Sequence, residues 1–337
     1  MAVPHVDVVV VAFGPEPRLE ACLSSVLASE GVEVRVVLVD NGCTRTDLDD
    51  LVVDERITLL RSGQNLGFAG GCCVGVEALD GEHVALVNSD ARVDVRALAE
   101  LVGALTEQIG MTTACVLLAD EPAVVNSAGN PVHFLGISWA GGFGEPMDRH
   151  LEAKDVASAS GAATILRREL WNALGGFDPA FFLYCEDLDL SLRVWQRGLR
   201  VRYVPTARVW HHYELTRNAR KRYFLERNRT LVVLTVFQSR TLVLLAPALL
   251  ILEVGLVLAA IRDGELAAKL RSYGWLLQHT GYLRSRRARV QSDRLQGDAF
   301  LAPVLTGRLD TPVAGGPAVT AANALLGPYW QAVRRWL

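Results

Sequence analysis

The segment VDVVVVAFGPEPRLEACLSSVLASE, residues 6–30, decides the fold class. Its first part, residues 6–13, is a nearly continuous apolar run rich in β-branched side chains, which predicts a buried β-strand. Its second part, residues 17–30, carries apolar residues at helical spacing, which predicts an amphipathic helix. A buried strand followed directly by an amphipathic helix is typical of α/β proteins with a parallel sheet.

The same alternation continues to about residue 90. Further strands are predicted at residues 34–39, 57–60 and 84–87, and a further helix near residues 69–79. We therefore predict an α/β fold with a mainly parallel, doubly wound sheet. Ligands of such sheets bind beyond the carboxyl ends of the strands, where Asp40-Asn41-Gly42 and Asn88-Ser89-Asp90 follow two of the predicted strands.

The pattern indicates that this domain extends to about His212. A strand is predicted at residues 162–166, a helix at 186–197 and a strand at 201–204 that Pro205 stops. The Gly-rich stretch between about residues 129 and 144 is too apolar for a flexible linker, so we interpret it as ordered loops over the sheet.

The composition changes after this domain. Residues 241–261 contain one charge, Glu253, and are long enough to span a bilayer. A charge is costly at the bilayer centre, and arginines flank both ends without an inside-outside bias, so a membrane-seated hairpin or interfacial helix fits better. A buried helix against the catalytic domain or a dimer partner is the alternative. The tail, residues 304–337, has little pattern, which is compatible with partial disorder.

Charge and cysteine content exclude several classes of protein. Residues 1–100 carry 17 acidic side chains against 7 arginines and no lysine, so a nucleic-acid-binding N-terminal half is not expected. The six cysteines form no CxxC pair and no signal peptide precedes the first strand, which indicates a reduced, cytoplasmic setting. Adjacent Cys72 and Cys73 are expected to be packed thiols rather than metal ligands.

The polar residues at the strand ends suggest a cation and a nucleotide. Asn88 and Asp90 are two residues apart and face the same way, and their hard oxygen ligands suit Mg²⁺ or Mn²⁺. An N-cap or Asx turn is an equally good explanation. Asp40 can accept hydrogen bonds from a base or ribose, or can belong to a plain turn.

Two further segments carry candidate chemistry. The glycines of NLGFAGG, residues 65–71, allow close approach to a diphosphate before a helix. The pair Glu186-Asp187 opens a helix after an aromatic run, so one carboxylate could act as general base toward a sugar hydroxyl, with helix capping as the alternative. His211 and His212 are structural hydrogen-bonding residues unless one shares a cation with Asp90.

Taken together, these segments resemble the family 2 glycosyltransferases of the GT-A fold, in particular their bacterial rhamnosyltransferase-like branch. The resemblance covers about residues 5–230 and rests on VVVVAFGPEPRLEACLSSV, VDNG, NLGFAGGCCVGV, LVNSDARV, SGAATILRRELWNALGGFDPAFFLYCEDLDLSLRVWQRG, VPTARVWHH and RKRYFLERNR. The run over residues 160–198 is the most specific of them.

The resemblance implies roles for individual residues. Asp187 takes the place of the catalytic base, with Glu186 beside it, and Asp90 that of the last acid of a DxD-type metal motif. His211, five residues before Thr216, looks like a further ligand of the metal or diphosphate. Expected donor contacts come from the ends of the strands and from the glycine-rich loop: Ala12, Phe13, Asp40, Asn65, Gly67, Phe68 and Asn88.

The sequence also departs from the family pattern. Ala12-Phe13-Gly14 stands where many relatives have Thr-Tyr-Asn, and Cys73 where they commonly have Asn. Asn88 and Ser89 replace the first acid of DxD and a frequent Pro, so the predicted metal binding rests chiefly on Asp90.

The resulting hypothesis is an inverting, Mn²⁺- or Mg²⁺-dependent glycosyltransferase. It would move a hexose or a rhamnose-like deoxyhexose from a nucleotide-diphosphate sugar to a lipid-linked or glycan acceptor at the cytoplasmic face of the membrane, as in cell-wall or surface polysaccharide synthesis. A catalytically silent membrane-associated scaffold with the same fold is the alternative. A nicotinamide-dependent oxidoreductase is disfavoured, because no GxGxxG follows the first strand.

The domain organisation expected on this hypothesis has three parts. A GT-A domain covers residues 1–230, with a nucleotide-sugar-binding half at 1–110 and an acceptor or catalytic half at 111–230. A hydrophobic and basic helical membrane-associating region covers 231–303, and the tail covers 304–337.

Overall fold

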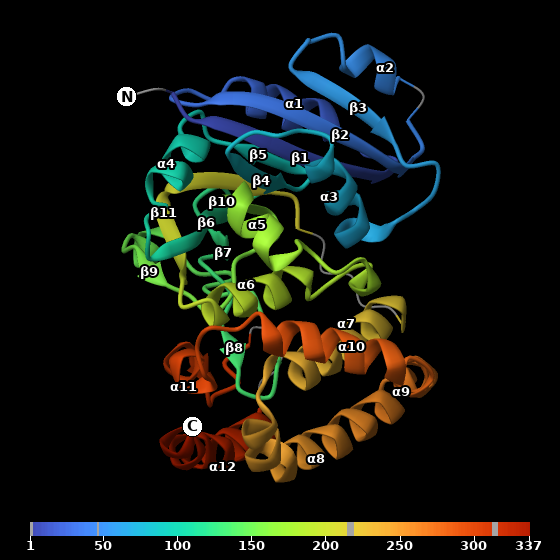
Figure 1. The fold of residues 1–337 in the computed structure, drawn as a ribbon, viewed down its shortest axis with the longest axis vertical. Helices are drawn as coiled ribbons and strands as arrows, with labels where there is room; N and C mark the ends of the chain where they lie inside the picture. Colours follow the sequence, from blue (N-terminus) through green and yellow to red (C-terminus); the bar gives the residue numbers. More distant parts are fainter. Residues whose placement is uncertain (1–2, 46, 214–218, 312–315) are drawn as a thin grey trace. The chain divides into compact units, whose positions relative to one another are not determined.

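A computed structural model describes residues 3–45, 47–213, 219–311 and 316–337 (Figure 1). The chain forms two compact units. Unit 1 comprises residues 1–130, 140–194 and 199–214, and unit 2 comprises residues 131–139, 195–198 and 215–337. Each unit is described by itself below.

Unit 1 is built on one large mixed sheet whose central strands run in the order β3-β2-β1-β4-β10-β6-β11-β5. The strands are β1 (His5–Gly14), β2 (Glu33–Cys43), β3 (Ile57–Arg61), β4 (His83–Val87), β5 (Ala91–Val93), β6 (Ile109–Leu118), β7 (Val125–Ser127), β9 (Lys154–Asp155), β10 (Ala163–Arg167) and β11 (Arg200–His211). Strands β1–β4 pair in parallel, as do β6 and β11, and antiparallel β10 joins the two groups. The predicted doubly wound α/β sheet is confirmed.

The two faces of β1 follow the two-residue period of a strand. Val6, Val8 and Val10 belong to the buried core that includes residues of α1 and α4. On the other face, Val9 and Val11 contact α3, where a Cβ at Gly75 would lie 2.5 Å from a Val9 methyl carbon. The helices of this unit are α1 (Leu19–Leu27), α2 (Leu48–Leu51), α3 (Gly67–Glu77), α4 (Ala97–Gly103), α5 (Arg168–Leu174) and α6 (Glu186–Gln196), of which the last two residues fall in unit 2.

The prediction that Pro205 stops the strand begun at residue 201 is wrong. Strand β11 continues through Pro205 to His211, and its pairing with β6 shifts register between Val204 and Arg208. A proline lacks the N–H that a regular ladder needs, so it is tolerated at such an irregularity. As a result, His211 lies at the end of a sheet strand rather than in a loop after it.

Unit 2 is mainly helical. It contains α7 (Ala219–Val236), α8 (Ser239–Arg262), α9 (Leu266–Gln278), α10 (Thr280–Ser292), α11 (Asp298–Leu301) and α12 (Pro317–Val333), with a two-stranded ribbon of β8 (Val132–His133) and β12 (Leu305–Thr306). Helix α8 is the one described helix that is long and apolar enough to cross a membrane. In the tail, α12 follows residues 312–315, which lie outside the described residues.

Candidate functional site

Strand pairing brings Asp90 and His211 together. Asp90 follows the carboxyl end of β4, and the next residue, Ala91, pairs with His211 in the antiparallel ladder between β5 and β11. Asp90 Oδ1 therefore lies 3.1 Å from His211 Nε2. The Asp90 side chain is 37% exposed, so the pair is open to a ligand. The sequence suggested a cation shared by Asp90 and His211, but it could not show that they are close in space. Thr216, five residues after His211, lies outside the described residues.

Neighbouring amides orient the His211 ring. Its Nδ1 lies 3.1 Å from Asn126 Oδ1, which fits an Nδ1–H donor and leaves the Nε2 lone pair facing Asp90. Asn88 Nδ2 lies 3.2 Å from the same Nε2. A lone pair and a carboxylate oxygen at 3.1 Å favour a cation or a proton between them. A second partner that fixes the tautomer in this way is usual for a metal-binding histidine.

This donor set fits a divalent cation with few protein ligands. Among the described residues there is no group of three or more His, Cys, Asp and Glu side chains that could hold a metal ion. Mg²⁺ commonly uses one or two protein ligands and completes its shell with water and substrate phosphates. Asp90 and His211 supply the one carboxylate and one imidazole that such a site needs.

The acid pair at the start of α6 follows strained backbone. Phe182, Tyr184 and Cys185 all have positive φ, between 62° and 70°, a region that non-glycine residues rarely adopt. Such strain persists only where surrounding contacts impose it, and it is common at functional sites. Here it delivers Glu186 and Asp187 directly from an irregular segment into the first turn of a helix.

Glu186 and Asp187 have different surroundings. Burial raises the pKa of Glu186 to about 8, and its Oε2 is buried without a hydrogen-bond partner among the described residues. Burial also raises the pKa of Asp187, but its carboxylate accepts hydrogen bonds from the backbone N–H groups of Leu188 (2.7 Å) and Gly161 (3.0 Å), which favour the ionised form. Asp187 is also the more exposed of the two. At neutral pH this arrangement suits Glu186 as a neutral acid and Asp187 as an accessible base.

The glycine-rich loop before α3 is held by a buried amide that the sequence analysis did not single out. Asn41 donates from Nδ2 to Asn65 Oδ1 (3.3 Å) and to the Gly67 carbonyl (3.1 Å), and its Oδ1 accepts from the N–H of Leu66 (2.8 Å). Asn65 in turn accepts from the Gly67 N–H. The loop that was predicted to approach a diphosphate is thus fixed from the end of β2.

This loop also contacts the strained segment. Gly67 has φ +72°, and a Cβ there would lie 2.2 Å from the carbonyl oxygen of Phe182. The N–H of Ala69 donates to the same carbonyl at 3.2 Å. Phe68 reaches Gly161, whose added Cβ would be 3.7 Å from the Phe68 ring and 3.6 Å from Asp187 Oδ2. The predicted donor loop and the predicted base therefore meet.

The remaining predicted donor residues lie at the ends of β1 and β2. Ala12 is buried and pairs in register with Asp40, whereas Phe13 is half-exposed. Asp40 Oδ1 accepts from the N–H groups of Gly42 and Cys43, so the turn that we considered as an alternative is present. These bonds use one carboxylate oxygen.

Glu16 is another residue that the sequence analysis missed. Its Oε1 accepts from the Phe13 N–H and from Ser89 Oγ, both at 2.9 Å, and joins the end of β1 to the residue before Asp90. Burial raises its pKa. The flanking Pro15 and Pro17 were the available signal, because they indicate a rigid turn at a strand end. Cys72 is buried and Cys73 is half-buried, with the Cys73 thiol donating to the Phe177 carbonyl at 3.2 Å.

Solved structures share the fold. The structure of GalNAc-T7 with UDP, GalNAc and Mn²⁺ superposes with a TM-score of 0.57 at 17% identity. The match covers 69% of this chain and 49% of the GalNAc-T7 chain. The mannosyltransferase PcManGT from Pyrobaculum calidifontis, solved with GDP-Man and Mn²⁺, covers all of this chain and 85% of its own with a TM-score of 0.51 at 16% identity. The expected GT-A fold is confirmed.

Two bacterial relatives are named for O-antigen biosynthesis and for rhamnosyl transfer. The O-antigen biosynthesis protein RfbC of Myxococcus xanthus is 30% identical over 229 residues, 64% of this chain, which spans only 18% of that protein. The N-acetylglucosaminyl-diphospho-decaprenol L-rhamnosyltransferase of Mycobacterium tuberculosis is 28% identical over 232 residues, 61% of this chain and 75% of its own. Residues 4–231 match the model described as glycosyltransferase like family 2. The chain is therefore a member of glycosyltransferase family 2, with rhamnosyltransferase-like relatives.

Proposed function

We propose that this chain is an inverting, metal-dependent glycosyltransferase that moves a hexose or a rhamnose-like deoxyhexose from a nucleotide-diphosphate sugar to an acceptor hydroxyl. The observation that carries the proposal is a chain of contacts through residues 160–162. The N–H of Asn88 donates to the Ala162 carbonyl, and the neighbouring Gly161 contacts both Asp187 and Phe68. The candidate metal-binding strand end, donor loop and base are thereby joined.

Asp187 acts as general base in this proposal. Its carboxylate takes the proton of the acceptor hydroxyl while the hydroxyl oxygen attacks the anomeric carbon. The bond from that carbon to the diphosphate oxygen breaks, and the configuration inverts in one displacement. Burial raises the pKa of the carboxyl group, which makes the carboxylate a stronger base, and the two backbone N–H groups favour its ionised form and orient it.

Asp90 and His211 would hold Mn²⁺ or Mg²⁺ beside the donor diphosphate. The bound cation supplies charge neutralisation for the departing nucleotide diphosphate. Asn126 keeps the imidazole in the tautomer that presents Nε2, and Asn41 fixes the backbone of the glycine-rich loop that would lie beside the donor. Asp40 Oδ2 accepts no hydrogen bond from the described residues, so it could accept one from the base or ribose of the nucleotide.

A panel of nucleotide sugars, titrated with and without Mn²⁺, tests this function. We expect one donor to bind and to be transferred, and Asp90→Ala to abolish transfer with the fold retained by circular dichroism. Asp120→Ala is the matched control, because Asp120 is an exposed acid beside His212. Full activity in EDTA contradicts the metal role, and donor binding without any turnover indicates the silent scaffold.

The proposed acceptor is a lipid-linked glycan at the cytoplasmic face of the membrane. Support comes from the apolar α8 and from the decaprenol-linked substrate in the name of the mycobacterial relative. Cell fractionation tests the location: the expressed chain should pellet with membranes, and salt alone should release only part of it, since salt screens arginines but not apolar contacts. A monomeric chain in the soluble fraction contradicts this part of the proposal.

A further inference from the structure

Helix α8 presents a continuous apolar face to solvent. Its exposed large side chains are mostly three, four or seven residues apart, which places them on one side of the helix. They are Val243, Leu250, Ile251, Val254, Leu258 and Ile261. Leu250 is 68% exposed, although burial of a leucine side chain is normally favourable. A face of this kind and length indicates an apolar partner.

On another side of α8, Glu253 holds the helix to α7 and α9 of the same unit through ion pairs. Glu253 pairs with Lys269 of α9 at 2.8 Å, accepts from Tyr273 at 2.5 Å, and pairs with Arg229 of α7. Lys269 is fully buried and also pairs with Glu226 at 2.5 Å. Moving α8 away from α7 and α9 would remove Glu253 from two buried cations, Lys269 and Arg229, and leave them only one carboxylate, that of Glu226, which is unfavourable. The outer face of α8 is thus available while the helix stays docked.

Helix α12 contacts α8 and carries no charged side chain. Residues 317–333 contain no Asp, Glu, Lys or Arg, and Leu325 is 75% exposed. The Tyr329 hydroxyl donates to the Leu244 carbonyl of α8, and buried Trp330 fixes α12 to Phe134. The helix is followed by Arg334, Arg335 and Trp336, of which Trp336 is 66% exposed.

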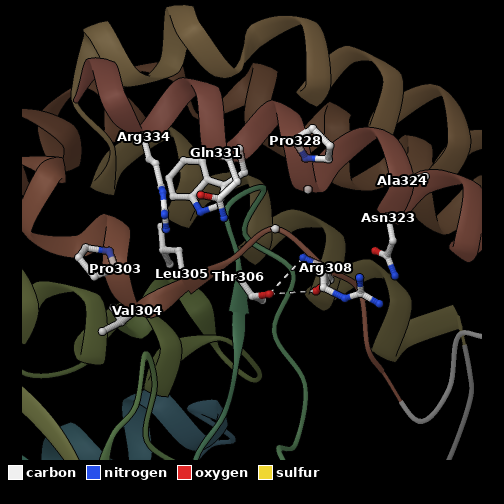
Figure 2. A pocket seen from close by; sticks show the side chains of 13 residues that line it. Pro303, Val304, Leu305, Thr306, Arg308, Asn323, Ala324, Pro328, Gln331 and Arg334 are labelled. Carbon is white, nitrogen blue, oxygen red and sulfur yellow. Dashed lines mark hydrogen bonds between the residues drawn. The ribbon is translucent and has the colours of Figure 1, made fainter.

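Basic side chains surround this pair of helices. Arg240 and Arg262 stand at the two ends of α8 and both are exposed, although Arg262 also pairs with Asp263 at 2.9 Å. A pocket of about 580 Å³ beside α12 is lined by Arg308 and Arg334 and by no carboxylate, although Arg308 also pairs with Asp310 at 3.3 Å (Figure 2). Apolar faces with arginine and tryptophan at their edges are typical of segments that lie in a membrane interface.

We propose that α8 and α12 together form one in-plane binding surface for an anionic lipid bilayer, with arginines on the phosphate groups and Trp336 at the interface. The occupant is a bilayer rather than a second copy of the chain. The exposed ionisable groups at the helix ends are predominantly arginines, which would repel the same arginines of a second copy and attract anionic lipids. This inference rests on the proposed membrane-facing function and deepens it, since it names the surface and its orientation.

Binding of the purified full chain to preformed vesicles tests the proposal. We expect it to sediment with phosphatidylglycerol/phosphatidylcholine vesicles and only weakly with phosphatidylcholine alone. Arg334→Gln with Arg335→Gln should weaken partitioning about 30-fold, from about fivefold for each arginine. Leu250→Glu and Leu325→Glu should each weaken it at least tenfold. Leu151→Glu, at a comparably exposed leucine of unit 1, is the matched control.

Fluorescence quenching reports how deeply this surface enters the bilayer. Brominated lipids should quench the part of the tryptophan emission that Trp336→Phe removes. Unchanged sedimentation of the Leu325 and arginine variants, or salt-independent dimers that bind no vesicles, would overturn the proposal. Binding only after insertion from detergent would overturn the in-plane orientation. Donor binding by each variant separates these outcomes from failure of the proposed transferase function, because no substitution touches the candidate donor site.

Discussion

Glu186 and Asp187 are adjacent, yet their surroundings assign them different roles. Asp187→Asn keeps the size of the side chain but only one of its two backbone hydrogen bonds, because the amide NH2 group cannot accept from the second N–H, and it cannot act as a base. We expect turnover to fall about 10²- to 10⁴-fold, the usual contribution of a positioned base, with little change in donor affinity. Glu186→Gln should cost less, because Glu186 is already neutral near pH 7. A larger loss in kcat for Glu186→Gln than for Asp187→Asn would reverse the assignment.

The raised pKa of Glu186 also predicts how stability depends on pH. Between the ordinary glutamate value of 4.5 and about 8, the folded chain keeps a proton that the unfolded chain has released. The free energy of unfolding therefore falls as pH rises through this window. Glu186→Gln removes this loss and should raise the urea midpoint relative to the parent chain more at pH 8 than at pH 5. Equal differences at both pH values would show that Glu186 is ionised in the folded chain.

At the scale of elements, the contact between the loop before α3 and the segment before α6 links donor and base. Gly67→Ala would force a Cβ into the Phe182 carbonyl at 2.2 Å, so the loop must move. Gly63→Ala is the control, because Gly63 has nearly the same φ (+70°) with nothing within 4 Å of its added Cβ. We expect Gly63→Ala to cost about 1–2 kcal/mol of stability and Gly67→Ala to lower turnover as well. Equal kinetic effects of the two would contradict the link.

The sequence predicted the elements better than the contacts between them. Strands such as β1 and β4 follow from apolar periodicity, which is a local signal. The extension of β11 through Pro205 depends on a register shift against β6, and the approach of His211 to Asp90 depends on the pairing of β5 with β11. Those partners are 90 or more residues apart in the sequence, as Val204 and Ala114 are, so no local pattern reports them. Asn126 and Asn41 were missed for the same reason, because their roles exist only in three dimensions.

At the scale of the whole molecule, unit 2 takes part of its core from a segment far away in the chain. Residues 131–139 belong to it, and Phe134 stacks on Trp330 of α12 with ring centroids 4.9 Å apart and planes within 2°. Both side chains are buried. Helix α12 is therefore a structural part of unit 2. The fold of this unit depends on residues 131–139, which lie in the sequence between β7 and β9 of unit 1.

This dependence can be measured with one tryptophan as the test and another as the control. Trp330→Ala should lower the free energy of unfolding by about 3–5 kcal/mol, because it leaves a large cavity, whereas Trp336→Ala should change it by less than about 0.5 kcal/mol. In a double-mutant cycle, Phe134→Ala and Trp330→Ala should show a coupling of about 0.5–1.5 kcal/mol, the value typical of stacked rings. Urea denaturation followed by circular dichroism measures each step. If the two substitutions have additive effects on the free energy of unfolding, residues 131–139 and α12 are stabilised separately. The C-terminal helices could then be removed without unfolding residues 131–139.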